Sequence, residues 1–152
     1  PNFQARLEDE GWRVATWSHG DQPEEATQIL LADTRGEMGL WYRLAPITFM
    51  GSSLISGHGG RDPFEPAALG SAILYGPNVS RYLPAYSRLA SAGAARIVRD
   101  AETLAGAITR LSAPDQAALM AHAAWEVSSD GAEATDRLMN LVQDVLDLKE
   151  AL

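Results

Sequence analysis

Short apolar runs alternate with amphipathic segments along most of this chain. Runs such as QILLAD (28–33) and SAILYG (71–76) are apolar without alternation, which is typical of strands buried on both faces of a parallel sheet. Residues 38–44 instead carry apolar side chains at the spacing of one helix face. The pattern predicts strands at 12–17, 28–33, 46–51, 71–76 and 94–98, and helices at 1–10, 38–44, 63–70 and, on either side of Pro84, 81–93.

The last third of the sequence is helical throughout. A helix at 100–112 can begin at Asp100 as its cap, and two more are expected at 113–129 and 130–152. The final helix carries a continuous apolar stripe made of Leu138, Leu141, Val142, Val145, Leu146 and Leu148.

Strands that alternate with helices predict an α/β fold with a Rossmann-like parallel sheet, helices on both of its faces and a helical C-terminus. In such sheets, ligands bind at the carboxyl ends of the strands. The loops that leave the strands at 28–33, 46–50 and 72–75 are therefore the places to look for a site.

Composition narrows the class of protein. With 152 residues, of which 46% are hydrophobic and 21% charged, the chain can bury one core, and we expect a single domain at 1–152. A formal charge of −8 argues against binding to nucleic acid, and the lack of cysteine excludes disulfides and thiolate metal sites. Because His19, His58 and His122 are scattered, we expect no metal site.

The loop after the strand at 46–50 reads GSSLISGHGGRDPFEP. Backbone N–H groups beside flexible glycines at a helix start can bind phosphate or carboxylate, and Arg61 would add a positive charge. Glu65 could then accept hydrogen bonds from sugar hydroxyls. An alternative stays open, because Asp62 as N-cap, Pro63 at N1 and Glu65 at N3 also form a good capping sequence.

The loop after the strand at 28–33, DTRGEMG, follows the same logic. Asp33 or Thr34 can cap the next helix, Gly36 allows a close backbone approach, and Glu37 falls in the predicted first turn. Capping and ligand contact are both compatible with this pattern. Neither loop contains G-x-G-x-x-G or G-x-S-x-G, so neither a dinucleotide fingerprint nor a serine nucleophile is expected.

Several motifs occur together in one order: LLADTRGEMGLWYRLAPITFMGSSL, then GGRDPFEPAALG, then ILYGP. From about residue 28 onward this series resembles the C-terminal half of the 3-deoxy-D-manno-octulosonic acid (Kdo) transferases. That family reads approximately D-T-x-G-E-L-G-L-W-Y, G-G-S-L, G-G-H-N-x-x-E-P and G-P. The resemblance implies a GT-B glycosyltransferase, with two Rossmann-like domains facing a cleft, of which this chain is part of the C-terminal, donor-binding one.

Three positions depart from the family pattern. Asp62 stands where the family has Asn, Arg61 where it has His, and Ser52 where it has Gly. Residue by residue, the resemblance implies donor contacts in all three motifs, and Glu65 is the residue expected to hold the ribose hydroxyls. The implied donor-binding set is Thr34, Gly36, Glu37, Met38, Ser52, Ser53, Gly59, Gly60, Arg61, Asp62 and Glu65.

The resemblance also implies an activity. CMP-Kdo would be the donor substrate and a lipid A precursor the acceptor, in lipopolysaccharide biosynthesis at the inner, cytoplasmic face of the inner membrane. The acceptor and the catalytic base would belong to an N-terminal domain, so this chain would supply no catalytic residue, and no cofactor or metal is implied. We therefore expect a truncated domain, inactive alone, whose open sheet edge and apolar stripe favour a homodimer.

Two alternatives remain open from the sequence. The same scaffold could serve a transferase or epimerase that uses a UDP-sugar. It could also be a non-catalytic Rossmann-like interaction module, in which Glu37, Asp62 and Glu65 only cap helices.

Overall fold

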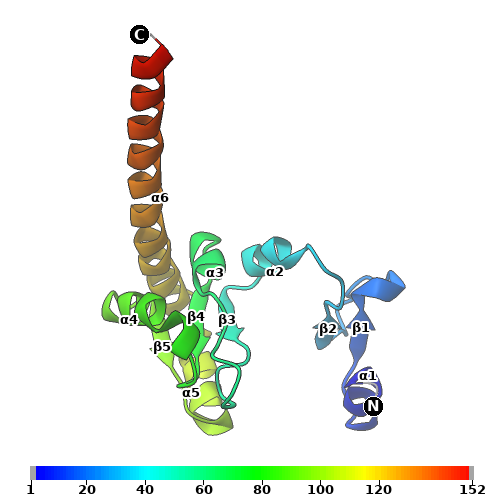
Figure 1. Cartoon of the computed structure of the whole chain (residues 1–152). Coiled ribbons are helices and arrows are strands. Elements are labelled where there is room, and N and C mark those ends of the chain that lie inside the picture. The colour runs from blue at the N-terminus through cyan, green and yellow to red at the C-terminus, as the bar shows by residue number, and fades with distance from the viewer. Residues whose placement is uncertain (1–2, 151–152) are drawn as a thin grey trace. The chain divides into compact units, whose positions relative to one another are not determined.

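The computed structural model describes the backbone of residues 3–150, and the side chains of these residues except 131–134, 145 and 148–150. The chain divides into two compact units, Pro1–Met38 and Gly39–Leu152. Figure 1 shows the elements of both, and each unit is described by itself.

The first unit contains one helix and two short strands. Helix α1 (Phe3–Asp9) ends where Gly11 takes a left-handed φ of +90°, as its position after the charged turn predicts. Strands β1 (Val14–Thr16) and β2 (Ile29–Leu31) pair in parallel, and a 3₁₀ turn, Trp17–His19, follows β1 directly. Both strands fall inside the ranges that the sequence predicts.

The second unit is built on a three-stranded parallel sheet. Its strands are β3 (Ile47–Met50), β4 (Ala72–Tyr75) and β5 (Ala95–Ile97), in the order β3-β4-β5. Met50 lies opposite Tyr75, and Tyr75 opposite Ile97, so the carboxyl ends of all three strands are aligned at one edge. The predicted α/β fold with parallel strands is confirmed.

The central strand β4 explains why its sequence is apolar without alternation. Ile73 and Tyr75 pack into one buried cluster with Tyr86 and Leu89 of α4 and Ala124 of α6. Ala72 and Leu74 face a second cluster, with Ala107 and Leu111 of α5. Helices thus cover both faces of the sheet, as predicted, and every residue of β4 is buried.

Five helices complete the structure. Asp100 forms a capping box with Thr103 at the start of α5, which confirms the predicted cap. No helix of the described residues is long and apolar enough to cross a membrane. The helices are α2 (Met38–Leu44), α3 (Phe64–Ala68), α4 (Leu83–Ser91, after a 3₁₀ turn at Ser80–Tyr82), α5 (Ala101–Leu111) and α6 (Pro114–Glu150).

The predicted boundary between the last two helices is wrong. Residues 113–129 and 130–152 were expected to form separate helices, but α6 runs without a break from Pro114 to Glu150 (Figure 1). The pair Asp130-Gly131 does not end the helix because one glycine costs only about 1 kcal/mol inside a run of strong helix formers. The chain is helical on either side of Pro84, as predicted, because the 3₁₀ turn Ser80–Tyr82 precedes it and Pro84 lies in the first turn of α4, where a missing N–H costs nothing.

Candidate functional site

The loop that leaves β3 is attached to the segment that leaves β4. The Ser53 side chain is fully buried, and its hydroxyl accepts a hydrogen bond from the Gly76 N–H at 2.8 Å. That hydroxyl also donates to the carbonyl oxygen of Met50, the last residue of β3. Asn78 adds two bonds, from its backbone N–H to the Ser53 carbonyl at 2.8 Å and from its side-chain amide to the Leu54 carbonyl at 3.0 Å. The two strand ends therefore form one rigid framework.

Two buried glycines hold the Gly-rich turn against the residues after β4. A Cβ on Gly59 would stand 2.4 Å from Cγ of Arg81, and one on Gly60 would stand 3.1 Å from Cα of Val79. Both glycines have left-handed φ values, +74° and +83°. The Arg81 N–H also donates to the Gly59 carbonyl at 3.2 Å. Only glycine at these positions allows the turn and the 79–81 segment to come this close.

An open pocket of about 560 Å³ lies at these strand ends. Its walls come from the Gly-rich turn and from the segment after β4, and its basic side chains are those of His58 and Arg81. A pocket of this size falls in the range of small-molecule sites. The lining residues are Gly57, His58, Gly59, Pro77, Asn78, Ser80, Arg81 and Leu83.

Sequence reasoning named only Gly59 among these lining residues. The other seven were not predicted as site residues, although the loop leaving the strand at 72–75 was a predicted location for a site. The available signal was the rule that ligands bind at the carboxyl ends of parallel strands, which points to residues 76–81 as directly as to 51–62. Arg81 is the most important of these residues for binding an anion, because its guanidinium group stays positively charged at any ordinary pH.

The helix start after the Gly-rich turn differs from the prediction. Asp62 is not the N-cap of α3, because Pro63 occupies that position and no side chain caps it. Asp62 instead accepts a hydrogen bond from the Phe64 N–H at 2.9 Å, and Glu65 lies one position earlier in the first turn than predicted. Since α3 spans only Phe64–Ala68, its dipole is small, and binding of an anion must depend mainly on the loop and on Arg81.

Tyr86 is bonded to the backbone at Arg61, and Tyr42 is affected by the charges of Glu65 and Arg61. The Tyr86 hydroxyl donates to the Arg61 carbonyl at 2.8 Å, and burial, followed by the charge of Asp62, raises its pKa above the usual range. Burial and then the charge of Glu65 raise the pKa of Tyr42, while Arg61 acts in the opposite direction. The carboxylate of Glu65 and the guanidinium of Arg61 therefore both act on the phenol of Tyr42, a residue that sequence reasoning quoted but did not assign.

Ser52 takes a backbone conformation that favours glycine. Its φ of +62° is the only left-handed value of a non-glycine residue in the described part of the chain. A side chain at this φ is strained by about 1 kcal/mol. This strain is a local cost that the packing around Ser53 sustains.

The earlier motif forms a separate group of side chains in the first unit. The carboxylate of Glu37 accepts hydrogen bonds from the indole N–H of Trp17, at 3.0 Å, and from the Thr34 hydroxyl. Asp33 accepts two bonds from Ser18, from its backbone N–H at 3.0 Å and its hydroxyl at 2.6 Å. These bonds from Ser18 lower the pKa of Asp33, so the carboxyl group is ionised at neutral pH.

The predicted roles of this motif in helix capping are wrong. Helix α2 begins at Met38, so Glu37 precedes the helix instead of lying in its first turn. The Asp33 carboxylate accepts a hydrogen bond from the Ser18 hydroxyl, and the Thr34 hydroxyl donates to Glu37. Neither side chain therefore caps α2. Gly36 has a left-handed φ of +90° with open space around it, and Met38 is exposed.

Thr34, Gly36, Glu37 and Met38 thus belong to the first unit, and the seven other predicted contacts belong to the second. Among those seven, Gly59 lines the pocket, Gly60 and Ser53 are buried, Ser52, Arg61 and Asp62 lie along the same loop, and Glu65 lies in α3. Within residues 3–150, the described side chains contain no cluster of three or more His, Asp or Glu that could hold a metal ion.

Comparison with curated proteins finds one group of relatives. A 3-deoxy-D-manno-octulosonic acid transferase of Haemophilus influenzae is 28% identical over 93% of this chain and 33% of its own length. The enzyme of the same name from Bordetella pertussis is 32% identical over the same shares. A probable mitochondrial 3-deoxy-D-manno-octulosonic acid transferase of Arabidopsis thaliana is 35% identical over 51% of this chain and 17% of its own. The chain spans about a third of the length of the first two relatives.

A solved structure matches the fold. The C-terminal CMP-Kdo binding domain of WaaA from Acinetobacter baumannii superposes with a TM-score of 0.73 and 26% identity, over 80% of this chain and 63% of that domain. No family model matches the sequence. The relatives and this structure nevertheless confirm the similarity that the sequence motifs indicated.

Proposed function

We propose that this chain, a homologue of the Kdo transferases corresponding to their C-terminal domain, binds the nucleotide-sugar donor of such a glycosyltransferase. The similarity to the CMP-Kdo binding domain, over 80% of the chain, is the observation that carries this proposal. The pocket at the carboxyl ends of β3 and β4 supports it, because nucleotides bind at this edge of parallel α/β sheets. CMP-Kdo is therefore the proposed donor.

The donor phosphate would bind at the Gly-rich turn. Arg81 supplies a positive charge there, and Gly57, which is exposed and has open space around it, lines the pocket with backbone that no side chain of the turn covers. Glu65, exposed at the start of α3, would accept hydrogen bonds from the ribose hydroxyls. This arrangement separates the phosphate, held by a cation, from the ribose, held by a carboxylate.

The proposed reaction is a direct displacement at the anomeric carbon of Kdo. An oxygen of the acceptor hydroxyl bonds to that carbon as the bond from the carbon to the CMP phosphate oxygen breaks. CMP leaves with the bonding electrons, and the hydroxyl proton passes to a base. This chain would contribute the charge of Arg81 to stabilise the departing phosphate, whereas the base and the acceptor, a lipid A precursor, would belong to another domain.

The parent enzyme would work at the inner face of the inner membrane, where a lipid acceptor is accessible.

A homodimer of this chain is a further part of the proposal. The exposed apolar side chains of Leu138, Leu141, Val142 and Leu146 on α6 support it. Val145 and Leu148, which complete the predicted stripe, lie outside the described side chains.

Titration with nucleotides tests the donor proposal. We expect calorimetry to detect CMP binding that is tighter than UMP binding, and Glu65→Gln to weaken it about tenfold through loss of charged hydrogen bonds. Glu102→Gln is the matched control, because Glu102 is an exposed carboxylate in the first turn of α5, away from the pocket. Both substitutions remove one negative charge from a helix start.

Each alternative has its own result in the same titration. UMP binding as tight as CMP binding would favour an enzyme that uses a UDP-sugar. The absence of binding by either nucleotide, with both variants folded, would contradict the proposal and favour the interaction module. CMP affinity that is equal in wild type and Glu65→Gln would remove Glu65 from the site.

A further inference from the structure

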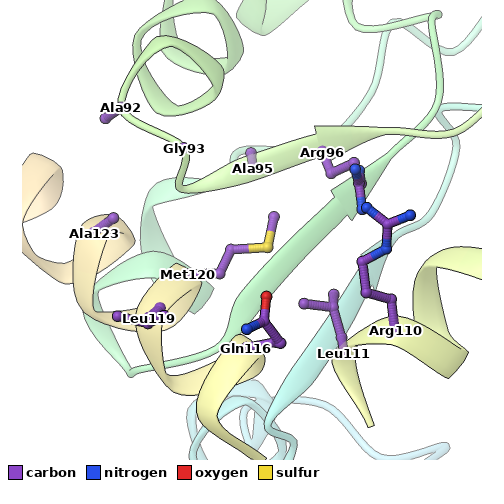
Figure 2. Close-up of a pocket in the computed structure, with 10 residues that line it drawn as sticks. All are labelled: Ala92, Gly93, Ala95, Arg96, Arg110, Leu111, Gln116, Leu119, Met120 and Ala123. Atoms are coloured by element: carbon purple, nitrogen blue, oxygen red, sulfur yellow. The ribbon is translucent and has the colours of Figure 1, made fainter. Parts of the chain in front are cut away.

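A second pocket lies on the second unit, and it shares no residue with the candidate donor site. It has a volume of about 420 Å³ and is enclosed by β5, the end of α5 and the first turns of α6 (Figure 2). A smaller pocket of about 310 Å³ continues along β5 and α5. Arg96 and Arg110 line both pockets, so the two cavities form one groove, called here the β5 groove, with both guanidinium groups at its middle.

The charge of the β5 groove is opposite to that of the chain. The sequence has 20 acidic and 12 basic residues, yet no Asp or Glu is among the residues that line either pocket. In the described part of the chain, neither Arg96 nor Arg110 forms an ion pair, in contrast to Arg88, which pairs with Asp130. Two unpaired cations at one place repel each other, and a bound anion would relieve that repulsion.

The backbone fixes the positions of both arginines. Arg96 is the central residue of β5 and lies opposite Leu74 of the buried strand β4. Arg110 is in the last turn of α5, directly before Leu111, which is buried in the core. Figure 2 shows their side chains at the same end of the larger pocket. Two neighbouring guanidinium groups can donate hydrogen bonds to the oxygen atoms of one phosphate group. Each of these oxygen atoms accepts several such bonds.

The rest of the larger pocket is mainly apolar. Leu111, Leu119 and Met120 form its surface, and Figure 2 shows Met120 extending toward β5. Gln116 adds one amide, whose nitrogen donates to the neighbouring Asp115 at 3.2 Å. A ligand that fits this surface has a phosphate at one end and a short apolar part at the other.

We propose that the β5 groove binds a phosphate-bearing ligand through Arg96 and Arg110. This site is separate from the donor site, and the proposal does not rest on the proposed function. A free phosphorylated small molecule and the phosphate of a lipid headgroup share this chemistry. The test therefore distinguishes these two sources.

The experiment maps backbone amide shifts by NMR during a titration with inorganic pyrophosphate. We expect shifts at groove residues such as Gly93, Arg96, Arg110 and Gln116, in addition to any at Gly59 and Arg81 of the donor pocket. Arg96→Gln and Arg110→Gln should each weaken the groove response about tenfold, since each removes one of two charged partners. Arg43→Gln is the control, because Arg43 is an exposed arginine of α2 that lines neither pocket.

A second arm uses vesicles of phosphatidylglycerol, compared with vesicles of phosphatidylcholine. Co-sedimentation with phosphatidylglycerol that both groove variants abolish and Arg43→Gln retains identifies a lipid headgroup. Pyrophosphate shifts without such co-sedimentation identify a free phosphate compound. The proposal is overturned if pyrophosphate leaves the groove amides unshifted and vesicles do not bind, or if both responses survive the groove substitutions. Thermal melts of the variants should match wild type, because both side chains are exposed.

Discussion

The two loops predicted to contact the donor have similar sequence patterns, with a glycine and a carboxylate near the start of a helix. They are held in place by different interactions. The loop after β3 is fixed through its backbone, by buried glycines packed on residues 79–81 and by Ser53 bonded to Gly76. The loop after β2 is fixed by side chains, with Ser18 holding Asp33 and Trp17 holding Glu37. A loop packed through its backbone cannot accommodate added side-chain atoms. A loop held by partly exposed side chains can instead rearrange at a small cost in free energy.

The largest effect is expected from Gly76→Ala, which attacks the backbone framework. The new Cβ would stand 2.4 Å from the Ser53 carbonyl oxygen and 2.5 Å from its carbon, and backbone atoms cannot rotate away. We expect the free energy of unfolding to fall by about 3 kcal/mol, measured by denaturant titration. The control is Gly106→Ala on α5, which meets nothing within 4 Å and should raise stability by up to about 1 kcal/mol. Equal changes in the free energy of unfolding for Gly76→Ala and Gly106→Ala would show that the Ser53 backbone does not exclude a side chain at Gly76.

Gly59→Ala and Gly36→Ala compare the two loops directly. Both glycines have left-handed φ values, so each substitution should cost about 1–2 kcal/mol of stability in thermal or chemical unfolding. Only Gly59→Ala also displaces a functional side chain, because its Cβ would meet Arg81 whereas the Cβ at Gly36 meets nothing. We therefore expect Gly59→Ala to weaken CMP binding more than Gly36→Ala does. The reverse order would remove Arg81 from the donor site.

Ser52→Gly should stabilise the loop after β3. Relief of the strained φ of +62° is worth about 1 kcal/mol, from which the greater flexibility of glycine in the unfolded chain subtracts a part. We expect a net gain of about 0.5 kcal/mol in the free energy of unfolding. Ser56→Gly is the matched control, since Ser56 lies in the same loop with no left-handed φ, and it should not stabilise. A loss of stability in Ser52→Gly would show that its side chain makes a compensating contact.

The smallest effect is the pH response of the loop after β2. Hydrogen bonds from Ser18 hold the pKa of Asp33 below its ordinary value of 3.8. The folded pKa is depressed, so the stabilisation is fully present above pH 3.8 and is lost as the pH falls through the folded pKa. An NMR titration of the Asp33 carboxyl group should give a pKa below 3.8, and Ser18→Ala should return it toward that value. An unchanged pKa in Ser18→Ala would show that the Ser18 hydroxyl does not stabilise the carboxylate, because the backbone N–H bond remains in this variant.

The sequence predicts where in the fold the candidate site lies, but not most of the side chains that line it. The strand-end rule pointed to the loops after residues 28–33, 46–50 and 72–75, since parallel strands read as unbroken apolar runs, and residues after the second and third of these strands line the pocket. It could not select Arg81, because an arginine after a glycine-proline pair has no local pattern that separates it from any solvated arginine. The capping roles predicted for Asp33 and Glu37 are wrong, because their observed partners, Ser18 and Trp17, lie far away in the sequence.

The sequence by itself determined the element order, the parallel α/β fold, the capping box at Asp100 and the similarity to the Kdo transferases. These depend on local periodicity and on ordered motifs, which a single chain displays directly. Only the tertiary structure decided that Ser53 and Gly76 join two strand ends, that Gly59 makes room for Arg81, and that Arg96 and Arg110 share a groove. In each of these cases residues far apart in the sequence meet, and close packing fixes which atoms can occupy the space between them.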